Sequence, residues 1–110
     1  MKKLICLFAI FCAALANTSY AKNYKNIILV QGSFTKNDDY ATQVISVSNH
    51  SGKTLTRVFV ECAYYGDEKL IASGSNLVEN LDNEETGSAK VISDNAKDAI
   101  LAKCRIVSAE

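Results

Sequence analysis

The strongest strand signal in this chain is the run at residues 55–65, which reads Leu55-Thr56-Arg57-Val58-Phe59-Val60-Glu61-Cys62-Ala63-Tyr64-Tyr65. It is the longest stretch of β-forming residues in the sequence. Successive side chains of a strand point to opposite faces. One face therefore carries Val58, Val60, Cys62 and Tyr64, and the other carries Arg57, Phe59, Glu61, Ala63 and Tyr65. We predict that this run is the central strand of a small β-domain.

Shorter β-like runs lie on both sides of it, with polar turns between them. The polar loop Asn49-His50-Ser51-Gly52-Lys53 is the clearest hairpin signal. Gly74 predicts that the strand beginning at Leu70 is an edge strand or contains a bulge. We predict the other strands at 27–34, 41–49, 70–72, 77–81, 86–93 and 99–107, and one helical turn at 94–98. About seven short strands at intervals of roughly ten residues indicate an all-β, antiparallel sandwich.

The first 21 residues have the pattern of a secretory signal peptide. Lys2 and Lys3 precede an apolar run that ends at Ala16, and this run is shorter than the about 20 residues that a spanning helix needs. Cleavage after Ala16 and cleavage after Ala21 both remain open, and the polar residues that follow favour the second. We expect a signal peptide at 1–21, a single domain at 22–110, a periplasmic or secreted location and no stable membrane insertion after processing.

Cleavage would remove two of the four cysteines and leave Cys62 and Cys104. Each lies on the more apolar face of its own predicted strand, and an oxidising compartment favours their pairing. We predict one disulfide, Cys62–Cys104, which closes a loop of about 43 residues and contributes roughly 4 kcal/mol by loop entropy. That is a large share of the stability expected of so small a domain. A pair of free thiols is the alternative.

The charge pattern bears on the kind of partner. The chain has 12 basic and 12 acidic residues, and loss of Lys2 and Lys3 with the signal would leave a slight acidic excess. Charges of both signs are interspersed, whereas nucleic-acid binding requires clustered Lys and Arg side chains. We therefore do not expect nucleic acid as a partner.

A resemblance rests on the order of several features. Gly32 is followed by a polar strand ending Val47-Ser48-Asn49, a Ser-Gly-Lys-Thr turn at 51–54, and the segment Ala63-Tyr64-Tyr65-Gly66-Asp67. In this order they resemble bacterial FxLYD-type and related exported immunoglobulin-like domains over about residues 28–92. The family's Leu-x-Pro-Gly-Glu turn would fall at 81–84, where Pro and Gly are absent, and Gly66 splits its Tyr-Asp step. The resemblance implies an immunoglobulin-like β-sandwich that serves as a non-catalytic module, and it supplies no catalytic residue.

The residues that carry chemistry are few. His50 is the single histidine, whereas zinc sites require three or four ligands and blue-copper sites require two histidines. We interpret His50 as an exposed loop residue. A buried thiol at Cys62 would be inert, because apolar surroundings raise the pKa of a thiol. The acidic pairs at 38–39, 67–68 and 84–85 fall in predicted turns, which favours solvated side chains over paired catalytic carboxylates. We expect no enzyme activity, no metal and no cofactor.

The remaining candidate site is a surface for a protein partner. If the cysteine face of residues 55–65 is buried, the opposite face presents two aromatic residues between charges, and aromatic side chains dominate binding surfaces. The predicted partner surface comprises Arg57, Phe59, Glu61 and Tyr65. Cross-strand packing that stabilises the sheet is the alternative. We expect a small exported protein-binding or envelope accessory domain; the alternative is a periplasmic immunity or inhibitor protein that neutralises a toxin or hydrolase.

Overall fold

The structure is a computed structural model that describes residues 24–110, so the predicted signal peptide at residues 1–21 lies outside the described residues. The described chain is all-β and contains no helix, including none that could cross a membrane. Its strands are β1 (Ile27–Lys36), β2 (Tyr40–Asn49), β3 (Leu55–Gly66), β4 (Lys69–Leu81), β5 (Thr86–Asp94) and β6 (Leu101–Ala109). The all-β prediction is confirmed.

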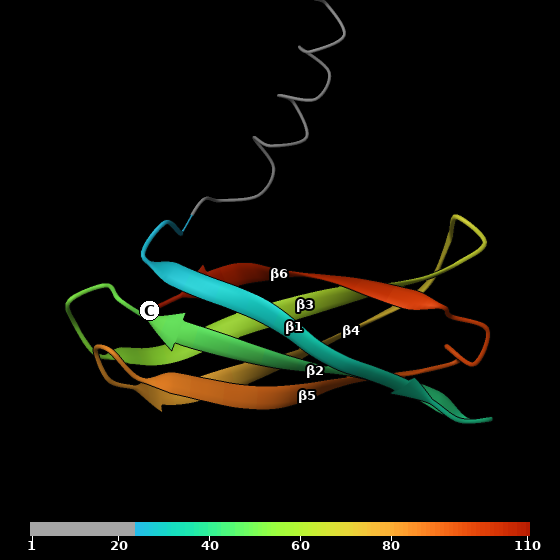
Figure 1. Cartoon of the computed structure of the whole chain (residues 1–110), viewed down its shortest axis with the longest axis horizontal. Coiled ribbons are helices and arrows are strands. Elements are labelled where there is room, and N and C mark those ends of the chain that lie inside the picture. Colours follow the sequence, from blue (N-terminus) through green and yellow to red (C-terminus); the bar gives the residue numbers. More distant parts are fainter. Residues whose placement is uncertain (1–23) are drawn as a thin grey trace, which may run out of the picture.

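The strands form two antiparallel sheets of three strands each, in the orders β1-β2-β5 and β4-β3-β6. Figure 1 shows the first sheet in front of the second. β3 pairs with β4 on one side and with β6 on the other. The strongest strand signal in the sequence is therefore the central strand of its sheet, as predicted.

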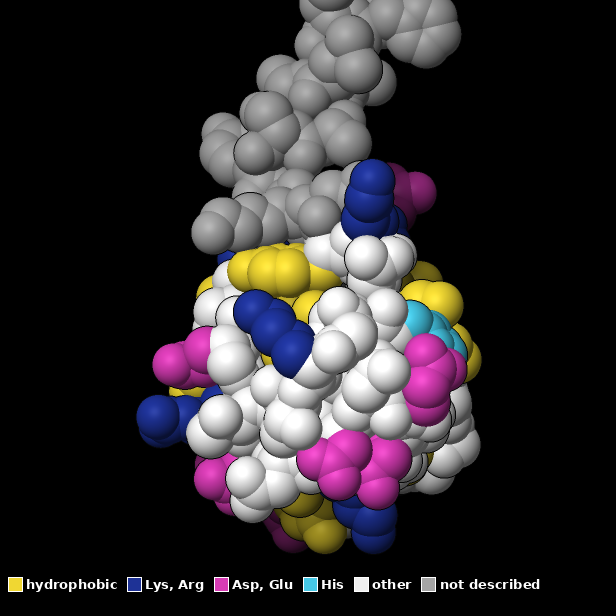
Figure 2. Space-filling view, turned by 90° about the vertical axis from the view of Figure 1, so that its left-hand side faces the viewer, with side chains coloured by type: hydrophobic (Ala, Val, Ile, Leu, Met, Phe, Trp, Pro, Cys, Tyr) yellow, Lys and Arg dark blue, Asp and Glu magenta, His cyan; other side chains and the backbone are white. Residues whose placement is uncertain are grey.

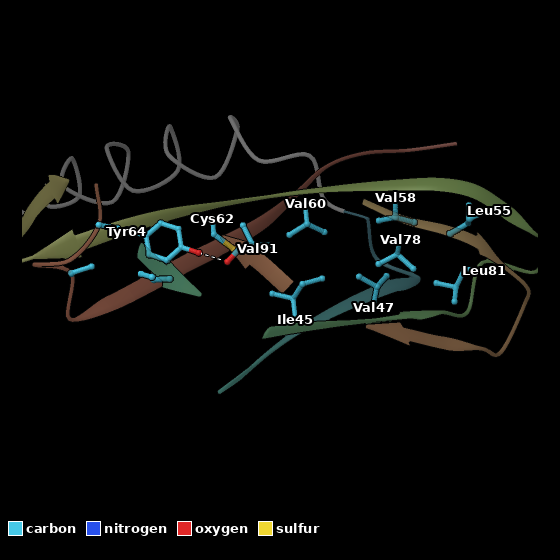
Figure 3. Close-up of a cluster of buried hydrophobic side chains, with 14 residues drawn as sticks. Ile45, Val47, Leu55, Val58, Val60, Cys62, Tyr64, Val78, Leu81 and Val91 are labelled. Atoms are coloured by element: carbon cyan, nitrogen blue, oxygen red, sulfur yellow. Dashed lines mark hydrogen bonds between the residues drawn. The ribbon is translucent and has the colours of Figure 1, made fainter. Parts of the chain in front are cut away.

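The core lies between the two sheets and is built from alternate residues of each strand (Figure 3). On β3 the buried face is the one that carries Cys62, and the residues of β2 and β5 that face it include Ile45, Val47 and Val91. Full burial of each such aliphatic side chain stabilises the fold by about 1.5–3 kcal/mol. The buried apolar residues are Ala41, Ile45, Val47, Leu55, Val58, Val60, Cys62, Tyr64, Val78, Leu81, Val91, Ala96, Ala99 and Ala102.

The described residues form six strands instead of about seven, because the strands predicted at 70–72 and 77–81 are parts of one long strand, β4. Gly74 does not interrupt it, since Gly74 pairs with Cys62 in the ladder. A Cβ atom at this position would lie 2.5 Å from the carbonyl oxygen of Ile92 on β5. The glycine therefore permits close approach of the neighbouring sheet. β4 is an edge strand, as predicted, and its register shift lies opposite Tyr64 and Tyr65.

The loop after β2 is not a hairpin, which corrects the sequence prediction. β2 and β3 belong to different sheets, so residues 50–54 carry the chain from one sheet to the other. The fully buried Asn49 shapes this crossing: its side-chain nitrogen donates to the carbonyl oxygens of Lys53 at 2.8 Å and Leu81 at 2.9 Å. Its side-chain oxygen accepts the Ser51 N–H at 2.9 Å. The local sequence encodes a turn, and Asn49 directs this turn across the end of the core.

The segment between β5 and β6 differs from prediction in two ways. Residues 95–100 form turns and no helical turn, with Asn95 at a positive φ of 61°. The last strand starts at Leu101 and not at residue 99. Ile100 therefore precedes the strand and does not point into the core with Ala102; it is 59% exposed. Ala96 and Ala99 are buried instead and cover this end of the core.

Polar side chains join the two sheets along their edges. At the β4–β5 edge, Ser93 Oγ donates to the Ser73 carbonyl oxygen at 2.8 Å, and Asn76 Nδ2 donates to the Lys90 carbonyl oxygen at 2.8 Å. At the β1–β6 edge, the side chain of Gln31 makes the equivalent connection. Side-chain amides and hydroxyls therefore satisfy strand-edge groups in a chain without proline.

Candidate partner-binding surface

The predicted disulfide is present and joins neighbouring strands of one sheet. Cys62 on β3 and Cys104 on β6 are directly paired, with 4.0 Å between their Cα atoms. Cys62 is fully buried and Cys104 is half-buried. The bond fastens the edge strand β6 to the central strand, and it leaves neither sulfur as a free thiol.

The four residues of the predicted partner surface lie on the side of the β4-β3-β6 sheet that faces away from the core, which we call the outer face. Arg57 is exposed, whereas Phe59, Glu61 and Tyr65 are half-buried. The strand geometry that buries Val58, Val60, Cys62 and Tyr64 places these four residues outside. Their placement on one face is as predicted, and their role in binding stays a prediction.

The two aromatic residues of this surface do not form a single patch. Six residues of extended strand separate Phe59 from Tyr65, a distance of about 20 Å. Between them, Arg105 Nη2 on β6 lies 2.9 Å from Glu61 Oε1. The ammonium group of Lys103 lies 5.5 Å from the centre of the Tyr65 ring, a cation–π contact. The outer face is therefore divided into a Phe59 end and a Tyr65 end by a charged centre.

Sequence reasoning missed the apolar residues beside Tyr65. Leu70, Ile100 and Leu101 are 63%, 59% and 41% exposed. A groove of about 460 Å³ lies at this end of the molecule and is lined by Tyr65, Asp67, Glu68, Ile100, Leu101 and Lys103. We call Tyr65, Leu70, Ile100 and Leu101 the apolar rim. Alternation alone gave no sign of it, since a strand at 99–107 places Ile100 on the same face as Cys104, whereas β6 begins at Leu101.

The turn beside this groove has an unusual backbone. Asp67 and Glu68 connect β3 to β4, and both have positive φ, 49° and 67°. Two consecutive left-handed residues are typical of a type I′ hairpin turn, which matches the twist of the strands. Glycine, asparagine and aspartate tolerate this geometry best, so Asp67 suits its position, whereas Glu68 holds a backbone conformation that it disfavours locally. Both residues line the groove together with Tyr65, Ile100 and Leu101 of the apolar rim.

A second missed residue is Gln31, which bridges the two sheets. Its Nε2 donates to the Ala102 carbonyl oxygen at 2.9 Å, and its Oε1 accepts the Cys104 N–H at 2.7 Å. Near the other end of β6, the Tyr24 hydroxyl donates to the Val107 carbonyl oxygen at 3.3 Å. A glutamine in a strand gives no sign in the sequence that it will bond to a strand 71 positions away.

The opposite end of the molecule is a polar loop cluster. Figure 2 views this end, where the histidine lies beside an acidic side chain; His50 Nδ1 is 2.9 Å from Glu84 Oε1. His50 is an exposed loop residue, as interpreted. The three acidic pairs singled out in the sequence all lie in connections between strands. Among residues 24–110, no group of three or more His, Cys, Asp or Glu side chains is arranged to hold a metal ion.

The outer side of the other sheet is rich in hydroxyl groups. Ser46 faces Ser88 at 3.2 Å and Ser48 faces Thr86 at 2.8 Å between side-chain oxygens. Ile28 and Val30 are exposed along its β1 edge. A second groove of about 420 Å³ on this sheet is lined by residues that include Tyr40, Ile92 and Lys90. Exposed apolar groups beside charges therefore occur on this surface too, but most of the residues that line this groove are polar.

Comparisons with protein-family models, with curated proteins and with solved structures found no match to this chain.

Proposed function

We propose that this protein is a small exported, non-catalytic module that binds another protein, with the apolar rim of the outer face as the contact surface. The observation that carries the proposal is the concentration of exposed apolar side chains around Tyr65: Ile100 and Leu101 line its groove, and Leu70 on β4 pairs with Tyr65. Clustered exposed apolar groups rimmed by charges are typical of protein interfaces. Asp67, Glu68 and Lys103 supply the charged border.

The strand arrangement supports an immunoglobulin-like sandwich as the scaffold. The chain passes from one sheet to the other after β2, and then β5 and β6 each return to the sheet of an earlier strand. Immunoglobulin-like domains distribute their strands over two antiparallel sheets in a similar way. The disulfide differs from that of antibody domains, which joins the two sheets, because Cys62–Cys104 lies within one sheet.

The disulfide also supports a periplasmic or secreted location. Disulfides form and persist in oxidising compartments and are rare in the cytosol. The amino-terminal pattern Lys2, Lys3 and an apolar run is consistent with export. An envelope accessory role follows from this location together with the binding surface.

An affinity capture with matched variants tests the proposal. The full protein is immobilised and exposed to an envelope extract of its source cells, alongside a Leu70→Ser/Ile100→Ser variant and an Ile28→Ser control. Ile28 is also exposed, at 48%, and lies on the other sheet. We expect a partner that the wild-type and control proteins retain and that the rim variant loses. A partner retained equally by all three proteins, or no partner at all, would contradict the proposal.

A further inference from the structure

One edge of the β4-β3-β6 sheet is held by side chains instead of by a neighbouring strand. β6 pairs with β3 on one side, and no described strand pairs with it on the other. At the opposite edge, the backbones of β4 and β5 come so close that Gly74 has no room for a Cβ atom. At the β6 edge of the described chain, only side chains make such contacts, from Gln31, Tyr24 and Lys36, so an additional strand has to displace side chains there and no backbone.

The pairing of β6 with β3 defines which of its peptide groups point away from the sheet. Cys62 and Cys104 form a closely spaced pair, with Cα atoms 4.0 Å apart, which is the kind of pair without ladder hydrogen bonds. The N–H and C=O groups of Cys104 therefore point outward, and the two-residue period extends this to Ala102 and Ile106. The bond from the Cys104 N–H to Gln31 agrees with this assignment.

Gln31 takes the place that a peptide group of an added strand would occupy. It accepts from the Cys104 N–H and donates to the Ala102 carbonyl oxygen through one planar amide. A strand arriving at this edge exchanges these two bonds for two equivalent bonds from its own backbone. It also reaches the outward N–H groups of Ala102 and Ile106, so the number of hydrogen bonds at the edge increases.

The side chains along β6 define the sequence that such a strand needs. Lys103 and Arg105 are exposed at the centre of the strand, and Leu101 and Val107 are 41% and 44% exposed towards its ends. Opposite charges directly across a strand pair stabilise it, and like charges destabilise it. Two acidic residues between two apolar residues on one face of the incoming strand complement this row. Arg105 is already paired with Glu61, so Lys103 carries more of the selectivity.

A second copy of this chain fits the edge poorly. An antiparallel pairing of two β6 strands centred on Cys104 places Lys103 of each copy opposite Arg105 of the other. This arrangement sets like charges against each other twice at the centre of the contact.

We propose that β6 is a strand-addition site that accepts an extended segment of a partner protein with two alternate acidic residues flanked by apolar ones. The proposal rests on the proposed protein-binding function and names the class of partner and the mode of contact. Leu101 belongs to both the β6 row and the apolar rim, so an added strand continues directly into that surface.

A synthetic peptide tests the site directly. The acidic probe is acetyl-Val-Thr-Glu-Val-Glu-Thr-Val-amide with a fluorophore; its lysine counterpart replaces both glutamates, and a third peptide has proline at the central valine. We expect the protein to bind the acidic probe at least about fivefold more tightly than the lysine peptide. In the lysine peptide, two attractive cross-strand charge pairs are replaced by repulsive ones. Proline removes the central N–H, so the third peptide should bind more weakly than the acidic probe.

Charge-reversal substitutions in the protein provide the matched variants. Lys103→Glu should remove most of the preference for the acidic over the lysine peptide, because it leaves one acidic and one basic residue in the row, whereas Lys90→Glu, the same change on the other sheet, should preserve it. Gln31→Ala should bind the acidic probe more tightly, because the probe no longer displaces a bound amide. Thermal unfolding of each variant checks that it is folded. Equal binding of the acidic and lysine peptides, or no effect of Lys103→Glu on a folded protein, would overturn the proposal.

Amide hydrogen exchange locates the contact. The acidic probe should slow exchange at the Ala102 and Ile106 amides, which point outward. The Lys103 and Arg105 amides, which face β3, should change little. Protection confined to other parts of the protein would place the probe elsewhere and contradict strand addition at β6. If the acidic probe does not bind but the captured partner still depends on the apolar rim, the strand-addition proposal fails and the proposed function stands. If the probe binds but no partner is captured, strand addition at β6 stands and the proposed function fails.

Discussion

Among residues 24–110, Tyr64 is the largest fully buried side chain, and it connects the two sheets. Its hydroxyl donates to the Val91 carbonyl oxygen on β5 at 2.6 Å (Figure 3). Its ring packs near that of Phe34 on β1, with 6.3 Å between the ring centres. A buried hydroxyl requires such a partner, because an unpaired polar group inside the core is costly. Tyr64 therefore combines apolar burial with one hydrogen bond between sheets.

Tyr64→Phe should lower the free energy of unfolding by about 1.5 kcal/mol, because it leaves the buried Val91 carbonyl without this donor. The measurement is urea unfolding at neutral pH. Tyr65→Phe, on the outer face of the same strand, is the matched control and should change stability by less than about 0.5 kcal/mol. Equal effects of the two substitutions would contradict the role assigned to the Tyr64 hydroxyl.

The same residue predicts a pH dependence. Burial raises the pKa of the Tyr64 hydroxyl above its usual value of 10.0, although a backbone hydrogen bond with Gln43 opposes the shift. In the unfolded chain this proton leaves first, so the contribution of Tyr64 is complete below about pH 10 and is lost as the pH rises through the folded-state pKa. The stability difference between wild type and Tyr64→Phe should therefore be constant below about pH 10, the usual tyrosine pKa, and shrink as the pH rises above it. A constant difference would exclude this linkage.

At the scale of elements, β6 is an edge strand that a disulfide ties to its neighbour. It pairs with β3 alone, and the Cys62–Cys104 disulfide fastens it there. Gln31 and Tyr24 add side-chain bonds on the other side. The disulfide thus stabilises the edge at which we propose strand addition.

Replacement of both cysteines, Cys62→Ala/Cys104→Ala, should lower the free energy of unfolding by about 2–4 kcal/mol. Amide exchange should accelerate more in β6 than in β2, because β2 has strands on both sides. In the wild-type protein a thiol reagent should label neither cysteine until a reductant is added. Labelling of the native, unreduced protein would show that the bond is absent.

For the whole molecule, the crossing between sheets depends on Asn49. This side chain is fully buried and makes three hydrogen bonds that hold the loop at 50–54 against the end of β4. Its backbone also bonds to the turn before β5, through Glu84 and Glu85. One residue therefore links the ends of both sheets.

Asn49→Ala should destabilise the protein by about 2–3 kcal/mol, because the Leu81 carbonyl loses its donor at a buried position and the Lys53 carbonyl loses its donor at a partly buried one. The control is Asn83→Ala in the neighbouring turn, where the side chain is exposed and accepts one bond from the Gly52 N–H. Its effect should be below about 1 kcal/mol. Thermal or urea unfolding of both variants is the measurement, and a smaller loss at Asn49 than at Asn83 would refute this account of the crossing.

Alternation in the sequence predicted the central strands well, since these have a paired strand on each side. Residues 55–65 fall within β3, and the face that carries Cys62 is buried as predicted. The prediction was wrong where the chain leaves regular pairing: the strands at 70–72 and 77–81 merge into β4, and Ile100 turns out to solvent. Gly74 suggested a break, and only the proximity of Ile92 explains why a glycine continues the strand.

The sequence by itself determined the all-β class and the two faces of the central strand, and it indicated the pair Cys62–Cys104, because these follow from side-chain alternation and residue type along single strands. Burial of the cysteine face was decided by the packing of the two sheets. The tertiary structure decided which strands are neighbours. It sends the chain across the sheets after Asn49, brings Gln31 to the edge of β6 and gathers the apolar rim around Tyr65. The physical reason is that pairing and packing depend on which faces and edges meet in space, and strand alternation is the same for every possible neighbour.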